Sequence, residues 1–200
     1  MSATTSTTRR VAIVQLASPD SESQAERIER VEGLLRQHTG VDLFVLPELW
    51  SAGYFAFDRY VELAETFDGP TVSMARRVAR ELGSAIHLGS FIERGADGAL
   101  HNTAVLVDAH GDIAQTYRKI HVFGYQSLES QLLAPGATLS VVDSPLGAIG
   151  STTCYDLRFP GLWQELSTRG AEVVAVPAAW PAAPRGPRCA VRRARAAGPA

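Results

Sequence analysis

Residues 41–50 read VDLFVLPELW, and this stretch decides how the chain folds. The run Val41–Leu46 is short and, apart from one aspartate, apolar, which is typical of a buried strand. It leads directly into Pro47 and Glu48, so a carboxylate follows the carboxyl end of that strand. In α/β folds, ligand-binding groups gather at this end of the strands. The stretch therefore predicts an α/β fold with Glu48 as a candidate functional residue.

Two amphipathic helices are predicted on either side of this strand. Ser23 and Glu26 have the spacing of a capping box, and apolar residues then recur at helical intervals until Gly40. Pro70 begins a second helix, which ends before Gly83. Helices that alternate with buried strands indicate layers of helix and sheet.

Hairpins are predicted in the middle of the chain. The sequences GADG at 95–98 and HGD at 110–112 separate strand-like runs and suit hairpin connections. Alternation at both ends, with hairpins between, predicts a layered α/β fold and not a purely parallel sheet. The predicted strands are 11–17, 41–46, 84–93, 101–109, 113–117, 138–143, 148–153 and 171–176, and a short helix is predicted at 161–168.

Length and composition are those of one ordinary globular domain. The chain has 200 residues, enough to bury a core. It contains no run of roughly 18 apolar residues, so no membrane partner is expected. Residues 1–10 lack the apolar core of a secretory signal and are expected to be flexible, which favours a cytoplasmic location. Two cysteines, Cys154 and Cys189, do not suggest a disulfide framework.

Charge is distributed unevenly along the chain. Residues 181–200 hold five Arg and no acid, so the other 180 residues hold 14 Lys+Arg against 21 Asp+Glu, a net charge of −7. An acidic body without a basic stripe argues against nucleic acid as a partner. The tail 181–200 is rich in Ala, Arg, Pro and Gly and offers almost nothing to pack, so we expect it to be disordered. The folded domain is expected to span 11–180.

Three residues combine a reactive side chain with a suitable position: Glu48, Lys119 and Cys154. A thiol needs a base to become a strong nucleophile, and a partly dry carboxylate can serve as that base. A fixed cation can then hold the oxyanion of a tetrahedral intermediate. The ordinary alternatives are a solvated carboxylate at a strand end and a core cysteine. A Cys–His pair with His121 is a further alternative, although we favour an orienting role for His121.

Four sequence blocks resemble the motifs of the nitrilase superfamily of carbon–nitrogen hydrolases. They are VLPELW around Glu48, YRKIHVFG around Lys119, ESQLLAPG at 129–136 and CYDLRFP at 154–160. They follow one another in the family's order and at roughly its intervals, which makes the combination specific. The ESxxLxPG block is most similar to the amidase and ω-amidase-like branches.

The resemblance implies an αββα sandwich that usually dimerises. It implies Glu48 as general base, Lys119 as the lysine that stabilises the intermediate, and Cys154 as the nucleophile. Glu129 matches a second glutamate that supports the lysine and positions the substrate. The backbone N–H of Tyr155 would be the partner oxyanion donor. The implied substrates are small amides, ω-amides, nitriles or N-carbamoyl compounds, with no metal and no cofactor.

The sequence departs from the family pattern after the strand predicted at 171–176. Family members normally continue with a helix and further strands that complete a sheet, so this chain is expected to lack the C-terminal elements of the fold. The composition of 181–200 suggests a frameshift or a truncated gene. Two function classes therefore stay open: a carbon–nitrogen hydrolase, or an inactive remnant that at most binds ligands or subunits.

Several other residues have weaker indications. Asp156 and Arg158 are expected to form a structural ion pair, and Arg158 could instead meet a substrate carboxylate. The aromatic residues Trp50, Tyr54 and Phe55 follow the proposed base and could line a pocket or pack a long loop. The remaining histidines lack the spacing of zinc ligands, so no metal site is expected; they are His38, His87, His101 and His110.

Overall fold

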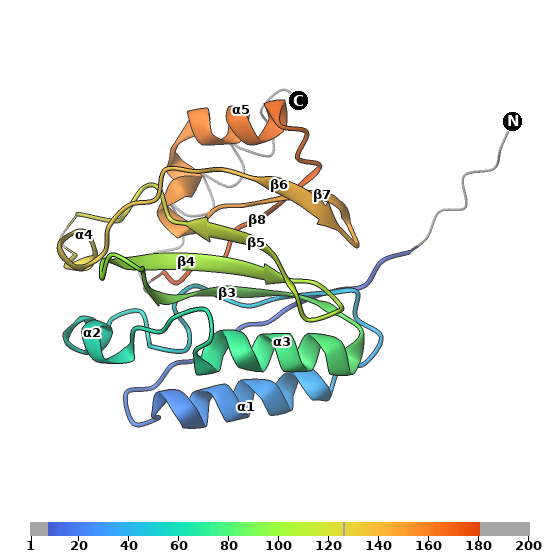
Figure 1. Ribbon diagram of the computed structural model, residues 1–200, viewed down its shortest axis with the longest axis horizontal. Helices are drawn as coiled ribbons and strands as arrows, with labels where there is room; N and C mark the ends of the chain where they lie inside the picture. Colours follow the sequence, from blue (N-terminus) through green and yellow to red (C-terminus); the bar gives the residue numbers. More distant parts are fainter. Residues whose placement is uncertain (1–7, 126, 181–200) are drawn as a thin grey trace, which may run out of the picture.

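The computed structural model describes residues 8–125 and 127–180. Two β-sheets face each other, and helices cover their outer faces (Figure 1). Helices α1 (Gln24–Arg36) and α3 (Pro70–Leu82) pack side by side against one sheet, and α5 (Pro160–Thr168) lies on the other. The predicted αββα layering is confirmed.

The larger sheet has five strands in the order β1-β2-β3-β4-β5. Its first three strands are parallel, while β3, β4 and β5 pair antiparallel as the two predicted hairpins. The second sheet has the order β6-β7-β8, with β6 antiparallel and β8 parallel to β7. The strands are β1 (Val11–Ile13), β2 (Leu43–Val45), β3 (Ala85–Arg94), β4 (Leu100–Val107), β5 (Ile113–Arg118), β6 (Val141–Ser144), β7 (Gly147–Ser151) and β8 (Val173–Ala175).

Helix α1 begins as its sequence predicts and ends earlier. The Ser23 hydroxyl accepts from the Glu26 N–H at 3.3 Å, and the Glu26 carboxylate accepts from the Ser23 N–H at 2.8 Å, which forms the capping box. The helix is capped by Gln37, so the predicted end at Gly40 was wrong by about one turn. Gly40 instead takes a positive φ of 71° in the connection to β2.

Four short elements were not predicted, because each is too brief to carry a periodic pattern. Two of them contribute residues to the site described below. They are the 3-10 helix η1 (Phe57–Arg59), α2 (Tyr60–Leu63), α4 (Glu129–Leu132) and the 3-10 helix η2 (Cys154–Arg158).

Among the described residues, the core has three apolar clusters, of which two lie between the layers. The larger cluster joins α1 and α3 to the five-stranded sheet and includes Leu35, Phe44 and Val78. The space between the sheets is filled by a smaller apolar cluster and by a polar link from β3 to β7, in which the His87 ring lies 3.0 Å from the Ser151 hydroxyl. Burial lowers the pKa of His87 to about 4, so the imidazole is neutral near pH 7.

The chain ends are described in part. Within the predicted flexible segment 1–10, the Arg9 guanidinium pairs with Asp42 at 3.0 Å and the Arg10 N–H donates to the same carboxylate at 2.7 Å. The predicted disordered tail 181–200 lies outside the described residues. In the part of the chain that the structure describes, no helix has the length and apolar character needed to span a bilayer.

A glycine in β3 allows the segment before Glu48 to approach the sheet. The pairing of β3 with β4 shifts register between His87 and Ser90, and Gly89 takes φ +74° there. A methyl group at Gly89 would collide with the carbonyl oxygen of Pro47. The bulge therefore sets the distance between β3 and the residue that precedes Glu48.

We predict that Gly89→Ala destabilises the fold far more than Gly98→Ala. Gly98 also has a positive φ, 82°, but open space around it, so both variants carry the backbone cost and only one adds the collision. The expected losses in the free energy of unfolding are about 3 kcal/mol for Gly89→Ala and about 1 kcal/mol for Gly98→Ala. Urea titration measures both, and equal losses would show that the close approach is unimportant.

Candidate active site

Glu48 is held on a loop that several backbone contacts fix in place. The Leu49 N–H donates to the Ser90 hydroxyl at 3.1 Å, and Leu49 itself takes φ +47°. The buried guanidinium of Arg27 donates to the carbonyls of Trp50 at 3.3 Å and Ser51 at 2.9 Å. These contacts turn the Glu48 side chain inward, where it is 1% exposed.

Lys119 lies one residue beyond β5 and is completely buried. Its N–H donates to the Asn102 carbonyl at 2.8 Å, which continues the β4–β5 ladder. Its ammonium lies 2.9 Å from Glu48 Oε1 and 2.8 Å from Glu129 Oε1. Burial alone would lower the pKa of Lys119, but the charges of the two carboxylates outweigh it and raise the pKa.

Glu129, at the start of α4, is the second carboxylate on this lysine and is also completely buried. Its Oε2 accepts from the Tyr54 hydroxyl at 3.0 Å. Asn102 on β4 donates from Nδ2 to Glu48 Oε1 at 2.9 Å and to Glu129 Oε1 at 3.2 Å. A connected buried network therefore surrounds the ammonium of Lys119.

Cys154 is the first residue of η2 and stands in the sharp turn after β7. It takes φ +46°, and its N–H donates to the Pro177 carbonyl at 2.9 Å. The thiol is 5% exposed. Burial, the charge of Glu48 and a hydrogen bond to that carboxylate raise the pKa of the thiol well above its usual value, and Lys119 opposes this shift. The resting state is therefore a thiol beside a carboxylate.

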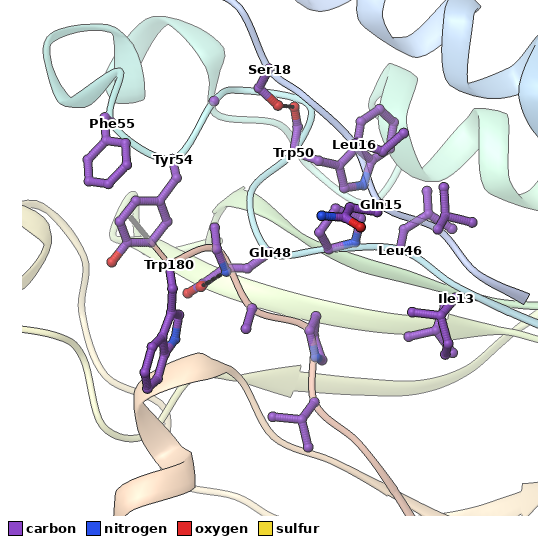
Figure 2. Close-up of a pocket in the computed structure, with 18 of the residues that line it drawn as sticks. Ile13, Gln15, Leu16, Ser18, Leu46, Glu48, Trp50, Tyr54, Phe55 and Trp180 are labelled. Atoms are coloured by element: carbon purple, nitrogen blue, oxygen red, sulfur yellow. Dashed lines mark hydrogen bonds between the residues drawn. The ribbon is translucent and has the colours of Figure 1, made fainter. Parts of the chain in front are cut away.

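The segment after β8 crosses over Glu48 and Cys154. The Ala179 N–H donates to Glu48 Oε2 at 2.9 Å, and its carbonyl lies 3.8 Å from Cys154 Sγ. The indole N–H of Trp180 points at the same sulfur. Beside this segment, a pocket of about 560 Å³ reaches Glu48, with Tyr54 and Trp180 on its wall (Figure 2).

Asp156 supports the turn of Cys154 and does not pair with Arg158. Its carboxylate accepts from the Thr153 N–H at 2.9 Å, the Tyr117 hydroxyl at 2.6 Å and the His121 ring at 2.7 Å. The predicted ion pair was therefore wrong. The guanidinium of Arg158 lies instead over the rings of Tyr155 and Trp180, at 5.2 and 5.7 Å from their centroids.

His121 belongs to this support and not to the thiol. Its ring is bonded to Asp156 and stacked on Phe159, with ring centroids 3.5 Å apart. Both contacts orient the loop of His121. They favour the orienting role of His121 over a Cys–His pair with Cys154.

Most of the residues singled out in the sequence come together. The side chains of Glu48, Lys119, Glu129 and Cys154 form one cluster, and Tyr155 follows the thiol in the first turn of η2, where N–H groups lack helical partners. Among the aromatic residues, Tyr54 joins the cluster. Trp50, which donates to the Leu88 carbonyl at 2.8 Å, and the exposed Phe55 line the same pocket as Tyr54, as the pocket-lining alternative predicts.

Asn102 and Ala179 were missed by the sequence reasoning. Asn102 stands between His101 and Thr103 in a predicted strand, and this was a usable signal because Asn is depleted in strands. No sequence signal pointed to Ala179, because it acts through its backbone.

Comparison with known proteins agrees with this geometry. The model of the carbon–nitrogen hydrolase family matches residues 10–197. This chain belongs to that family. The family is the nitrilase superfamily expected from the four motif blocks, so that prediction is confirmed. Relatives include a 2-oxoglutaramate amidase of Paenarthrobacter nicotinovorans, 36% identical over 86% of this chain and 60% of that protein.

Further members of this carbon–nitrogen hydrolase family support the amidase branch. A deaminated glutathione amidase of Yersinia enterocolitica is 35% identical over 85% of this chain and 62% of its own length. The crystal structure of XC1258 from Xanthomonas campestris, a CN-hydrolase superfamily protein with an arsenic adduct in its active site, has a TM-score of 0.83 at 29% identity, over 94% of this chain and 71% of that one. The chain thus spans about three fifths of the length of the two amidases.

Glu48 and Lys119 have opposing effects on the pKa of the Cys154 thiol. Variants of the two residues should therefore shift the pH midpoint of its alkylation by iodoacetamide in opposite directions. Glu48→Gln removes a charge that raises the pKa of Cys154, so the pH midpoint of alkylation should fall. Lys119→Met removes a charge that lowers it, so the midpoint should rise. Mass spectrometry follows each cysteine separately, with Cys189 as the internal reference. Shifts in the same direction would contradict the arrangement.

Proposed function

We propose that this protein hydrolyses the carbon–nitrogen bond of a small amide through a thioester on Cys154. The observation that carries the proposal is the buried cluster in which Lys119 bridges Glu48 and Glu129, while Ala179 contacts both Glu48 Oε2 and the sulfur of Cys154. Such a cluster supplies a nucleophile, a base and an oxyanion cation, the groups that acyl transfer needs.

The first half-reaction forms the thioester and releases ammonia. Glu48 takes the thiol proton as Sγ attacks the carbonyl carbon of the substrate, and the carbonyl oxygen becomes an oxyanion. The ammonium of Lys119 has three N–H donors, of which two are directed at carboxylates. The third, with the backbone N–H of Tyr155, is proposed to hold the oxyanion. Glu48 then returns its proton to the nitrogen as the carbon–nitrogen bond breaks.

The second half-reaction regenerates the enzyme. A water molecule takes the place of ammonia, Glu48 removes one of its protons, and the water oxygen attacks the thioester carbon. Collapse of this second tetrahedral intermediate breaks the carbon–sulfur bond and returns the proton to the sulfur. The products are the carboxylic acid and the free thiol. Glu129 supports Lys119 throughout and is proposed to position the substrate.

The finer proposal is that the preferred amide carries a carboxylate at its other end. Relatives of this chain are named 2-oxoglutaramate amidase and omega-amidase, and both names denote amides of dicarboxylic acids. Arg158 is exposed and is held over the ring of Trp180, whose indole N–H faces Cys154 Sγ. A guanidinium one indole ring away from the nucleophile is well placed for a carboxylate.

Location and assembly are also proposals. A cytoplasmic location is proposed, and the family resemblance suggests a homodimer or a larger homo-oligomer. Light scattering coupled to gel filtration measures the oligomeric state directly.

Turnover should depend on both charged partners of the thiol. We expect Glu48→Gln to lower kcat/KM for amide hydrolysis by roughly two to four decades, the usual effect of losing a general base. Lys119→Ala should lower it by about two to three decades, and Lys119→Arg should not restore it, because a planar fork does not replace a compact ammonium. Ammonia release from a panel of amides, ω-amides, nitriles and N-carbamoyl compounds is the measurement. If His121→Ala were more harmful than Glu48→Gln, the Cys–His alternative would be preferred; no release from any substrate would favour a non-catalytic binding role.

The role of Arg158 can be tested with two substrates of the same length. For the monoamide of a dicarboxylic acid, Arg158→Ala should raise KM about tenfold, because a charge-assisted contact with the carboxylate is lost. For the neutral aliphatic amide, KM should stay within about twofold. Equal effects on both substrates would refute carboxylate recognition by this residue.

A further inference from the structure

Asn102 on β4 is hydrogen-bonded to both glutamates of the site and to the backbone of Lys119. Its Nδ2 donates to Glu48 Oε1 at 2.9 Å and to Glu129 Oε1 at 3.2 Å. Its backbone carbonyl accepts from the Lys119 backbone N–H at 2.8 Å. The residue is 1% exposed. One position in the sheet therefore fixes two carboxylates and the backbone of the lysine between them.

The carboxylates determine the orientation of the Asn102 amide. Ionised carboxylates only accept hydrogen bonds, so the NH₂ group must face them, with one N–H for each. The other end, Oδ1, is then buried and has no partner among the described residues. A buried acceptor without a partner disfavours the folded state. Stability alone therefore does not account for an Asn at this position.

The hydrogen bonds of Asn102 add to the ion pairs that Lys119 forms with the two glutamates. Glu48 and Glu129 are like charges whose Oε1 atoms both lie within 2.9 Å of one ammonium. Lysine is a flexible point charge and does not fix the rotation of a carboxylate. Asn102, a second donor on the rigid strand β4, can fix the rotation of each carboxylate without adding charge. It also lets one N–H of the ammonium remain for the substrate oxygen.

We propose that Asn102 is a positioning residue that sets the orientation of the Glu48 carboxylate toward Cys154 and keeps Glu129 on Lys119. The inference rests on the proposed amide hydrolysis for its effect on turnover. Asn102 does not contact the thiol, so it acts through the two glutamates. A misplacement of a reacting group by about 1 Å can cost about a hundredfold in rate, so the predicted effect is measurable.

The test compares Asn102→Ala and Asn102→Asp with a matched control, Thr103→Ala. Thr103 is the next residue of the same strand, is 0% exposed and donates to Glu93 at 2.6 Å, outside the site. All variants are made in the full 200-residue chain. A thermal transition close to that of Thr103→Ala shows that each variant folds.

Asn102→Ala should lower kcat by about tenfold to a hundredfold with KM within about threefold. Asn102→Asp gives a distinctive pH dependence, because a carboxyl group donates only while it is protonated. Its activity should be retained best at low pH and lost as pH rises, so the alkaline limb of kcat/KM moves to lower pH. A uniform loss at all pH values in Asn102→Asp would count against the donor role.

A double-mutant cycle with Glu129→Gln tests whether Asn102 acts through the glutamates. If it does, the loss caused by Asn102→Ala should be clearly smaller in the Glu129→Gln background than in the wild type. Additive losses, or wild-type kcat in Asn102→Ala, would overturn the inference.

Alkylation of Cys154 by iodoacetamide separates this inference from the proposed function. The N–H dipole of Asn102 lowers the negative potential around the thiol, so its removal should slow alkylation at pH 7 by about threefold to tenfold, which corresponds to at most about one pH unit. Thr103→Ala should stay within about twofold of wild type. A wild-type protein that releases no ammonia would refute the hydrolase proposal, while the alkylation ratio would still decide the role of Asn102.

Discussion

The ammonium of Lys119, fully buried between two carboxylates, is the interaction on which the arrangement of this domain depends. Removing a charge from water is costly unless the charge is paired and hydrogen-bonded. Burial of Lys119 therefore requires that Glu48 and Glu129 be buried beside it. The three groups come from separate parts of the chain: the loop after β2, the end of β5 and the start of α4. The bulge at Gly89 and the contacts of Arg27 bring the loop into place. The packing of the layers thus places the three charged groups within hydrogen-bonding distance of one another.

The surroundings of Cys154 also determine the protonation state of this proposed nucleophile. Burial and the charge of Glu48 raise the pKa of the Cys154 thiol, and the charge of Lys119 opposes this shift. A Cys–His pair would have the opposite effect, because an imidazolium stabilises a thiolate. Here the raised pKa favours the protonated thiol. His121 is therefore available to orient the nucleophile turn through Asp156.

The sequence predicted much of this structure where the signal was local or formed a motif. The capping box of Ser23 and Glu26, the hairpins and the four family blocks led to the αββα layers and to the residues of the ion cluster. Tertiary contacts decided the rest. Arg158 lies over aromatic rings and not beside Asp156, because that carboxylate already accepts from Tyr117, His121 and Thr153. The roles of Asn102 and Ala179 depend on atoms far apart in the chain, which no spacing encodes.

Backbone strain is concentrated at the same site. Among the described residues, only Leu49 and Cys154 combine a side chain with a positive φ, 47° and 46°. One follows the proposed base directly and the other is the proposed nucleophile. Such conformations cost roughly 1–3 kcal/mol each and persist only where the surroundings enforce them. A buried ion cluster, an Asn acceptor without a partner and two strained residues all disfavour folding relative to a simple apolar core. A requirement for stability alone would not retain these costly features at one place. The proposed chemistry of the site explains why they occur together.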